Sequence, residues 1–117
     1  MAINKELLKG TTTLLILQLL DEGDKYGYQM VKELENRSQS LFTLKEGTLY
    51  PILHNLEAER MIEAYWEETE KSRKRKYYRI TKNGKKLLVD KKTEWLAYSK
   101  GVAGIIGGGA YGELGSC

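Results

Sequence analysis

The spacing of hydrophobic residues along the chain predicts four helices and one β-hairpin. Residues 5–20 predict a first helix, and apolar side chains cover nearly the whole circumference of its second half, so we expect it to be buried between other elements. Residues 25–38 predict a second, amphipathic helix, with Asp24 positioned to cap its first turn. The residues that this helix is expected to turn inward are Tyr28, Val31 and Leu34.

Residues 45–60 predict a third helix with two unlike sides. The i, i+3, i+4, i+7 spacing of one apolar stripe is made by Leu49, Ile52, Leu53 and Leu56. The other side carries small, hydroxylated, aromatic and amide groups, which can lie against a base edge or a phosphate without desolvating a charge. These residues are Gly47, Thr48, Tyr50, Pro51, His54 and Asn55. Because the helix dipole favours phosphate at the N-terminus, we expect a nucleic acid to approach the first half of this side.

Pro51 lies inside this predicted helix, where it removes one backbone donor and crowds the carbonyl group of Gly47. Three interpretations are open. The helix is kinked there, or the ring supplies an apolar contact such as one to a thymine methyl group, or the proline has no particular role near a helix start.

Two short runs rich in aromatic and β-branched residues, 61–68 and 75–81, predict a β-hairpin, because the polar residues 69–74 join them. The mostly apolar residues 41–44 predict a short strand that pairs with this hairpin. A helix with one polar side, followed directly by a hairpin with a basic tip, is the layout of a winged helix-turn-helix domain. The predicted fold class is therefore mainly α with a small β-hairpin.

Thr81 is placed to cap a last helix over residues 82–106, in which apolar residues recur every seven positions. This seam is made by Leu88, Trp95 and Val102, with Leu96 beside it. In so small a chain a second copy is the simplest partner, so these four residues form the predicted dimer interface. Alternatively the helix folds back on the first helix of its own chain, and both contacts can coexist. The predicted organisation is a DNA-binding domain over residues 1–81, this dimerisation helix, and a flexible, glycine-rich tail over residues 107–117.

The charges are unevenly distributed along the chain. The net charge of the 117 residues is only +3, but residues 71–92 hold 11 of the 19 basic side chains and a single acidic one, Asp90. Such a stripe is typical of a nucleic-acid-binding surface, although a solvated lysine-rich face gives the same pattern.

Few residues are suited to catalysis. One histidine, one terminal cysteine (Cys117) and the absence of a metal-ligand cluster argue against an enzyme and against a metal or other cofactor. A single cysteine excludes a disulfide framework, so we expect a cytoplasmic protein. The apolar run 14–20 is far too short to cross a membrane.

Together these patterns favour sequence-specific binding of double-stranded DNA by a homodimer. The expected target is a palindromic operator whose half-sites lie roughly 34 Å apart. The residues expected to contact DNA come from the start of the second helix, the third helix and the wing: Tyr26, Thr48, Tyr50, Pro51, His54, Asn55, Lys71, Arg73, Lys74 and Arg75. The alternative is a dimeric interaction module of the same fold without specific DNA binding.

The same residues resemble a known family. Residues 47–57, Gly-Thr-Leu-Tyr-Pro-Ile-Leu-His-Asn-Leu-Glu, are followed by Tyr65 and Trp66 and by residues 73–84, Arg-Lys-Arg-Lys-Tyr-Tyr-Arg-Ile-Thr-Lys-Asn-Gly. At this separation they resemble the PadR-like bacterial transcriptional regulators, in the short form that has a single C-terminal helix, over roughly residues 5–100. The resemblance implies a dimeric winged-helix repressor.

The resemblance also implies an effector site, since members of this family are known for repression that responds to drugs and phenolic compounds. A two-fold axis at the seam would bring Trp95 close to its copy and form an aromatic slot for a flat molecule. The lining carried over from the family is Leu7, Leu14, Gln18 and Ser99. Lys91 and Lys92 make the mouth of this slot cationic, so a neutral or anionic aromatic ligand is at least as well suited as a cationic drug. The alternative is that Trp95 is plain dimer core.

Overall fold

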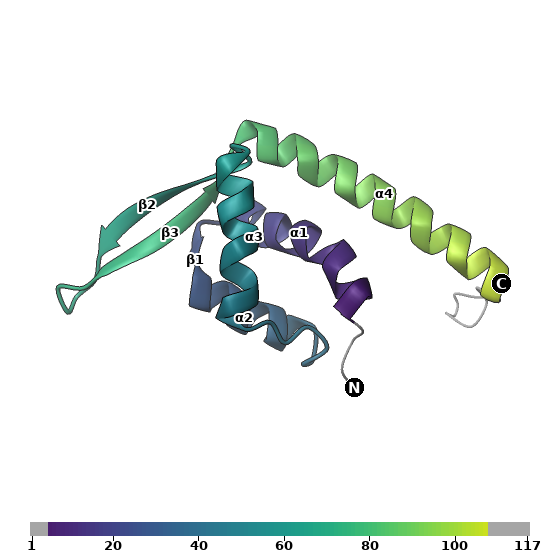
Figure 1. Cartoon of the computed structure of the whole chain (residues 1–117), viewed down its shortest axis with the longest axis horizontal. Coiled ribbons are helices and arrows are strands. Elements are labelled where there is room, and N and C mark those ends of the chain that lie inside the picture. Colours follow the sequence, from purple (N-terminus) through teal and green to yellow (C-terminus); the bar gives the residue numbers. More distant parts are fainter. Residues whose placement is uncertain (1–4, 108–117) are drawn as a thin grey trace.

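The structure, a computed structural model, describes residues 5–107, with side chains from residue 10 onward (Figure 1). Its elements in chain order are α1 (Lys5–Asp21), β1 (Lys25–Tyr26), α2 (Gly27–Arg37), α3 (Glu46–Ala58), β2 (Ile62–Glu68), β3 (Lys74–Ile80) and α4 (Lys82–Ile106). The predicted fold class, mainly α with a small β-hairpin, is confirmed. The predicted tail falls outside the described residues from residue 108 onward.

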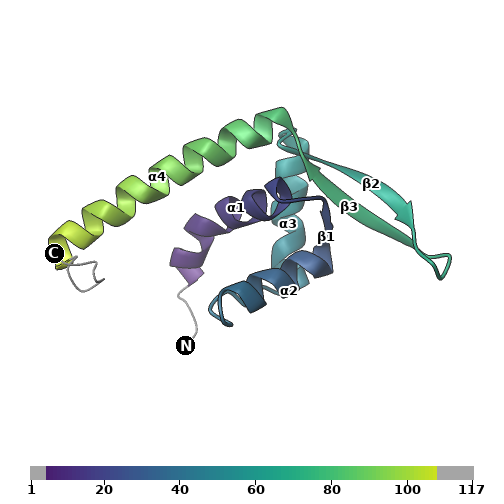
Figure 2. The ribbon, with the colours of Figure 1, turned by 180° about the vertical axis from the view of Figure 1, so that it is seen from behind.

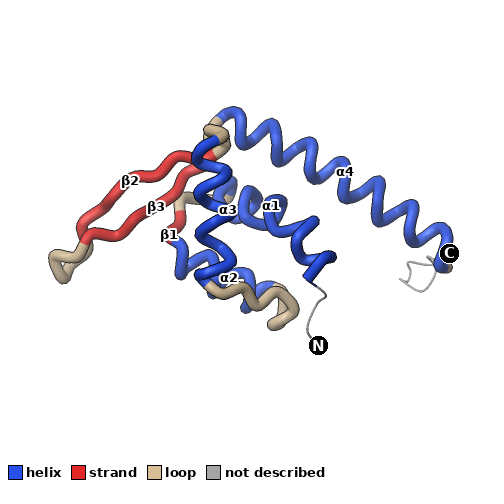
Figure 3. The backbone as a smooth tube through the Cα atoms, viewed as in Figure 1, coloured by secondary structure: helices blue, strands red, loops and turns tan. Residues whose placement is uncertain are grey.

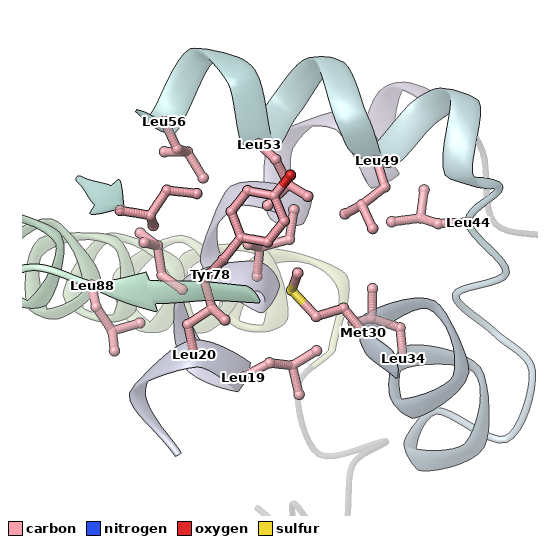
Figure 4. Packing of buried hydrophobic residues seen from close by; sticks show 13 residues of the cluster. Leu19, Leu20, Met30, Leu34, Leu44, Leu49, Leu53, Leu56, Tyr78 and Leu88 are labelled. Atoms are coloured by element: carbon pink, nitrogen blue, oxygen red, sulfur yellow. The ribbon is translucent and has the colours of Figure 1, made fainter. Parts of the chain in front are cut away.

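The hydrophobic core lies where α1, α2 and α3 meet the base of the sheet, and Figure 4 shows side chains from all of these elements converging there. α1 contributes four buried hydrophobic residues, Ile16, Leu17, Leu19 and Leu20, which confirms that its second half is enclosed. Tyr78 of β3 is only 2% exposed, and burial raises the pKa of its hydroxyl group to about 12. This core fixes α3 against the sheet and so sets the position of the wing.

The three strands form one antiparallel sheet in the order β1-β3-β2. β2 and β3 pair from Ile62 opposite Ile80 to Glu68 opposite Lys74, which confirms the predicted hairpin. The third strand is not the one that we predicted. β1 pairs with β3 through Lys25 and Tyr26, whereas residues 41–44 belong to a loop, as Figure 3 shows. The apolar residues of that loop instead anchor it, since Leu44 is buried in the core.

Two details of α2 differ from the prediction. The N-cap residue is Tyr26 and not Asp24, because the chain is still in the sheet at residue 25. Asp24 instead accepts a hydrogen bond of 2.7 Å from the hydroxyl group of Tyr65. Tyr28 is 51% exposed and does not face inward, because the buried stripe of this helix is made by Gly27, Met30 and Leu34.

α3, the wing and α4 are joined at one compact junction. Thr81 caps α4 as predicted, because its hydroxyl oxygen accepts a hydrogen bond of 3.0 Å from the Gly84 amide. The same hydroxyl group lies within hydrogen-bond distance of the Arg60 and Met61 carbonyl oxygens, and the Thr81 amide donates to the Met61 carbonyl. The start of α4 is therefore tied to the end of α3.

α4 packs on α1 only along its first turns. Leu88, the first residue of the predicted seam, is 3% exposed and belongs to the core of its own chain, so the fold-back alternative holds for this part of the helix. Figures 1 and 2 show the rest of α4 extending away from the other helices. Its exposed large hydrophobic residues are Val89, Trp95, Leu96, Tyr98, Val102, Ile105 and Ile106.

Candidate nucleic-acid interface

The polar side of α3 faces solvent, as the sequence predicts. Leu49, Leu53 and Leu56 are buried on the opposite side of the helix. The exposed predicted contacts are Thr48, Pro51, His54 and Asn55. Pro51 lies inside α3, which extends beyond it to Ala58, so the ring sits on the outer surface of the helix. This side of α3 thus offers a hydroxyl group, an apolar ring, an imidazole and an amide to an approaching surface.

Tyr50 is held between two helices of the domain and is less exposed than these four residues. It is half-buried, and its hydroxyl group donates to Glu46 at 3.3 Å. Burial, with the neighbouring Glu46 carboxylate, raises the pKa of the Tyr50 hydroxyl group. Its ring lies so close to Gly27 that a Cβ atom there would be 2.6 Å from the Tyr50 oxygen. Tyr50 therefore locks α3 to α2.

The tip of the wing carries unpaired positive charge. A backbone hydrogen bond of 2.7 Å from the Thr69 amide to the Arg73 carbonyl closes the turn. The side chains of Lys71, Arg73 and Lys74 are exposed, and none of them forms an ion pair with a side chain of residues 10–107. Since no carboxylate of this part of the chain neutralises them, these cations are available to phosphates.

One face of the sheet carries three tyrosine rings in contact, from the strand before α2 to the outer strand of the wing. Tyr26 meets Tyr77 edge to face with ring centroids 5.5 Å apart, and Tyr77 stacks on Tyr65 at 5.7 Å. The Arg75 guanidinium carbon lies 4.1 Å from the Tyr26 ring centroid, a cation–π contact. Two predicted DNA contacts, Tyr26 and Arg75, are thus brought together beside the start of α2.

The hydrogen bond from the Tyr65 hydroxyl group to Asp24 holds the outer end of this row of rings in place. It raises the pKa of the Tyr65 hydroxyl group to about 12, because the bond stabilises the protonated form. The Arg79 guanidinium carbon lies 4.7 Å from the Tyr65 ring centroid, and Arg79 Nε forms an ion pair with Glu63 Oε1 at 3.2 Å. The wing is therefore braced against the start of α2.

Sequence reasoning missed a link between the wing and α3. The Lys76 ammonium lies 3.8 Å from Glu57 Oε1 and 5.4 Å from the Tyr78 ring centroid. Alternation along β3 could have revealed it, since Lys76 lies two residues from the buried Tyr78 and so shares its face. Together with the tyrosine rings, this ion pair fixes the angle between the wing and α3.

The predicted effector residues come from two helices, with Leu7, Leu14 and Gln18 on α1 and Trp95 and Ser99 on α4. Trp95 is 45% exposed on α4, and the Ser99 hydroxyl group donates to the Leu96 carbonyl in the same helix. Leu14 is half-buried against the core, and the side chain of Leu7 lies outside the described part of the structure.

Gln18 lines a groove between α1 and the end of α2. The groove has a volume of about 340 Å³ and is lined by Leu15, Gln18, Leu19, Glu33, Leu34, Arg37, Ser38, Leu41 and Phe42. The Gln18 amide donates to Glu22 at 2.7 Å, and Glu22 also binds Arg37. Trp95 is not among the residues that line this groove.

Two other kinds of site are absent from the described part of the chain. No three carboxylate, imidazole or thiol groups there lie close enough to hold a metal ion. Among the same residues, no helix is both long and apolar enough to cross a membrane.

Comparisons with known proteins agree with this geometry. A family model described as the transcriptional regulator PadR-like family matches residues 16–90. An uncharacterized protein of Lysinibacillus sphaericus is 40% identical over 93 residues, which cover 80% of this chain and 85% of that protein.

Solved structures extend the agreement to three dimensions. A transcriptional regulator from Clostridium thermocellum has a TM-score of 0.79 at 36% identity, over 86% of this chain and 94% of that one. A PadR family transcription regulator from Clostridium difficile has a TM-score of 0.73 at 35% identity, over 83% and 99% of the two chains. These proteins are transcriptional regulators and not enzymes. Because the family model spans more than half of the sequence, the chain belongs to the PadR-like family of transcriptional regulators.

Proposed function

We propose that the chain is a dimeric repressor that binds a palindromic operator and is released by a small aromatic effector. The observation that carries the proposal is the pairing of an exposed polar side of α3 with a braced wing whose tip bears unneutralised cations. In this proposal α3 enters the major groove and the wing lies on the flanking backbone. A cytoplasmic location follows, because bacterial DNA lies there.

The contacts to DNA divide into two kinds. Thr48, Pro51, His54 and Asn55 are proposed to meet base edges, with Asn55 suited to adenine by its amide. The basic residues of the wing tip, with Tyr26 and Arg75 beside the start of α2, are proposed to hold phosphates. Tyr50 is omitted from the proposed contacts because its hydroxyl group and ring are engaged within the domain.

Dimerisation is proposed to use the second half of α4. Trp95, Leu96 and Val102 are between 37% and 56% exposed and lie beyond the part of α4 that α1 covers. Large apolar side chains gathered along one exposed helix indicate an interface. Leu88 is omitted, since it is already buried in its own chain. Two copies paired in this way would present two α3 helices to one face of a duplex.

The salt dependence of binding tests the wing. A duplex would first be selected from a random pool, and its affinity measured by fluorescence anisotropy from 50 to 300 mM salt, a range in which each phosphate contact contributes a slope of about 0.9. Because a dimer carries two wings, Lys74→Ala should reduce the slope by up to about 1.8.

The matched control is Lys100→Ala, which removes a cation that is also exposed, from α4, and should leave the slope unchanged. A palindromic selected site would support the dimer. Equal slopes for wild type and Lys74→Ala would contradict the role of the wing. Failure of the wild type to retain any duplex, at low salt as well, would contradict DNA binding and favour the interaction module.

The effector part of the proposal rests on Trp95. In a Trp66→Phe background Trp95 is the only tryptophan, so its emission reports on the proposed slot directly. A planar phenolic compound should quench this emission and release the labelled operator over the same concentration range. Quenching without release would leave Trp95 as a binding site with no regulatory role.

A further inference from the structure

Trp66 lies in the wing but takes no part in the ring, cation–π and ion-pair contacts that brace the wing. It lies in the middle of β2 and is 63% exposed. Strand residues two apart share a face, so Trp66 lies on the same face as Ile62, which is 1% exposed, and Ala64, which is half-buried. The core covers this face at the base of the wing and ends before it reaches the indole ring.

The face that carries Trp66 is the one directed toward α3. Its cross-strand neighbour is Lys76, and the Lys76 ammonium reaches Glu57 of α3 at 3.8 Å. His54 precedes Glu57 by three residues, so the exposed imidazole lies on the same side of α3, one turn nearer its start. The opposite face of the sheet is occupied by the tyrosine rings. Trp66 therefore stands in the angle between the wing and α3, where Figure 1 shows the hairpin diverging from the helix.

The chemistry around the ring fits a sugar-phosphate strand. Lys74 lies two residues from Lys76 on β3 and so projects from the same face, diagonal to Trp66. Glu68 is opposite Lys74 in the sheet, but the two side chains form no ion pair, so the Lys74 ammonium stays free. A flat apolar ring next to a free cation matches a backbone in which apolar deoxyribose alternates with anionic phosphate.

We propose that Trp66 is a non-ionic contact to the DNA backbone, with its indole ring packed on a deoxyribose of the strand that passes between α3 and the wing. This inference rests on the proposed function, since it requires that α3 and the wing bind one duplex. The contact adds affinity without adding charge, because it buries apolar surface of the ring and of the sugar.

Affinity and salt slope together separate this contact from an electrostatic one. Trp66→Ala should weaken binding to the selected duplex at least about fivefold while the salt slope stays at the wild-type value, because no charge is removed. Lys74→Ala should instead lower the slope. The control is Val89→Ala on α4, where a side chain of similar exposure (62%) is shortened away from the wing, and its affinity should equal that of wild type. Unchanged unfolding midpoints would establish that each variant is folded.

A second measurement reports on the environment of the Trp66 ring by ¹⁹F NMR. Protein labelled with fluorotryptophan has two ¹⁹F resonances, and the one lost in Trp66→Phe belongs to Trp66. Adding the selected duplex should shift this resonance in step with binding measured by anisotropy. Binding by anisotropy with neither a shifted Trp66 resonance nor a weaker Trp66→Ala variant would overturn this inference and leave the proposed function standing. No binding by the wild type would overturn both.

Discussion

Gly84 lies in the first turn of α4, and we expect Gly84→Ala to destabilise the protein although alanine is the better helix former. An ideal Cβ atom at Gly84 would overlap the Met61 carbonyl oxygen and lie 2.7 Å from Ile80 Cγ1. That carbonyl oxygen already accepts the Thr81 amide hydrogen bond, so it is held in place by the cap of α4. The added methyl group can therefore be accommodated only if α4 moves away from the end of α3.

The size of the effect follows from two opposing terms. Overpacking a filled region costs about 1–3 kcal/mol, and a backbone obstacle that cannot change rotamer favours the upper end of that range. Replacing glycine by alanine inside a helix returns about 1 kcal/mol. The net loss of unfolding free energy is about 2 kcal/mol, which lowers the urea midpoint by about 1 M for a slope of about 2 kcal/mol per M.

The assay is urea unfolding followed by circular dichroism, with all variants at one protein concentration, because the proposed dimer would gain stability with concentration. Gly101→Ala is the matched control. It makes the same substitution in the same helix, where nothing lies within 4 Å of the new Cβ atom, and should gain about 0.5–1 kcal/mol. If Gly84→Ala were as stable as Gly101→Ala, the close approach of α4 to the Met61 carbonyl would be refuted.

Charge and packing contacts elsewhere in the domain give three more measurable expectations. The hydrogen bonds from Arg37 and Gln18 lower the pKa of Glu22 to about 2. Glu22→Gln should therefore reduce the free energy of unfolding by up to about 1 kcal/mol at neutral pH. In urea unfolding repeated from pH 5 toward pH 2, this difference from wild type should shrink as Glu22 becomes protonated. Gly27→Ala pushes on the Tyr50 ring and should destabilise by about 1–2 kcal/mol, but by less in a Tyr50→Ala background, so additive losses in a double-mutant cycle would contradict the contact. The pKa values of Tyr65 and Tyr78 are both raised to about 12, so absorbance at 295 nm should show two tyrosines ionising near pH 12 in wild type and one fewer in Tyr65→Phe.

Periodicity was sufficient to predict the helices and the hairpin. The apolar stripe of α3 and the cap at Thr81 are local sequence patterns. Such patterns predict the structure correctly when tertiary packing favours the same conformation. The third strand could not be found in this way. β1 has only two residues, too few to show alternation, while residues 41–44 carry an apolar run that fits a core anchor as well as a strand.

The exposure of candidate interface residues could be predicted where it depends on one helix alone. It could not be predicted where it depends on contacts between two helices. The outward polar side of α3 follows from its helical period. The position of Tyr50 depends on the missing side chain of Gly27 in another helix, and no spacing within α3 encodes that contact. Leu88 likewise belongs to a seven-residue seam in sequence, but it is buried in the core of its own chain, whereas Trp95 and Val102 of the same seam are exposed.

If two copies pair through the second half of α4 as proposed, this long exposed part of the helix restricts how the spacing between the two domains can vary among related proteins. Each residue inserted after Leu88 would rotate everything beyond it by about 100° around the helix axis and turn Trp95 away from the proposed interface. Seven added residues restore the facing almost completely and lengthen the arm by about 10 Å. Relatives that pair through this helix are therefore expected to differ in arm length by whole heptads, and operator spacing would change in steps of that size.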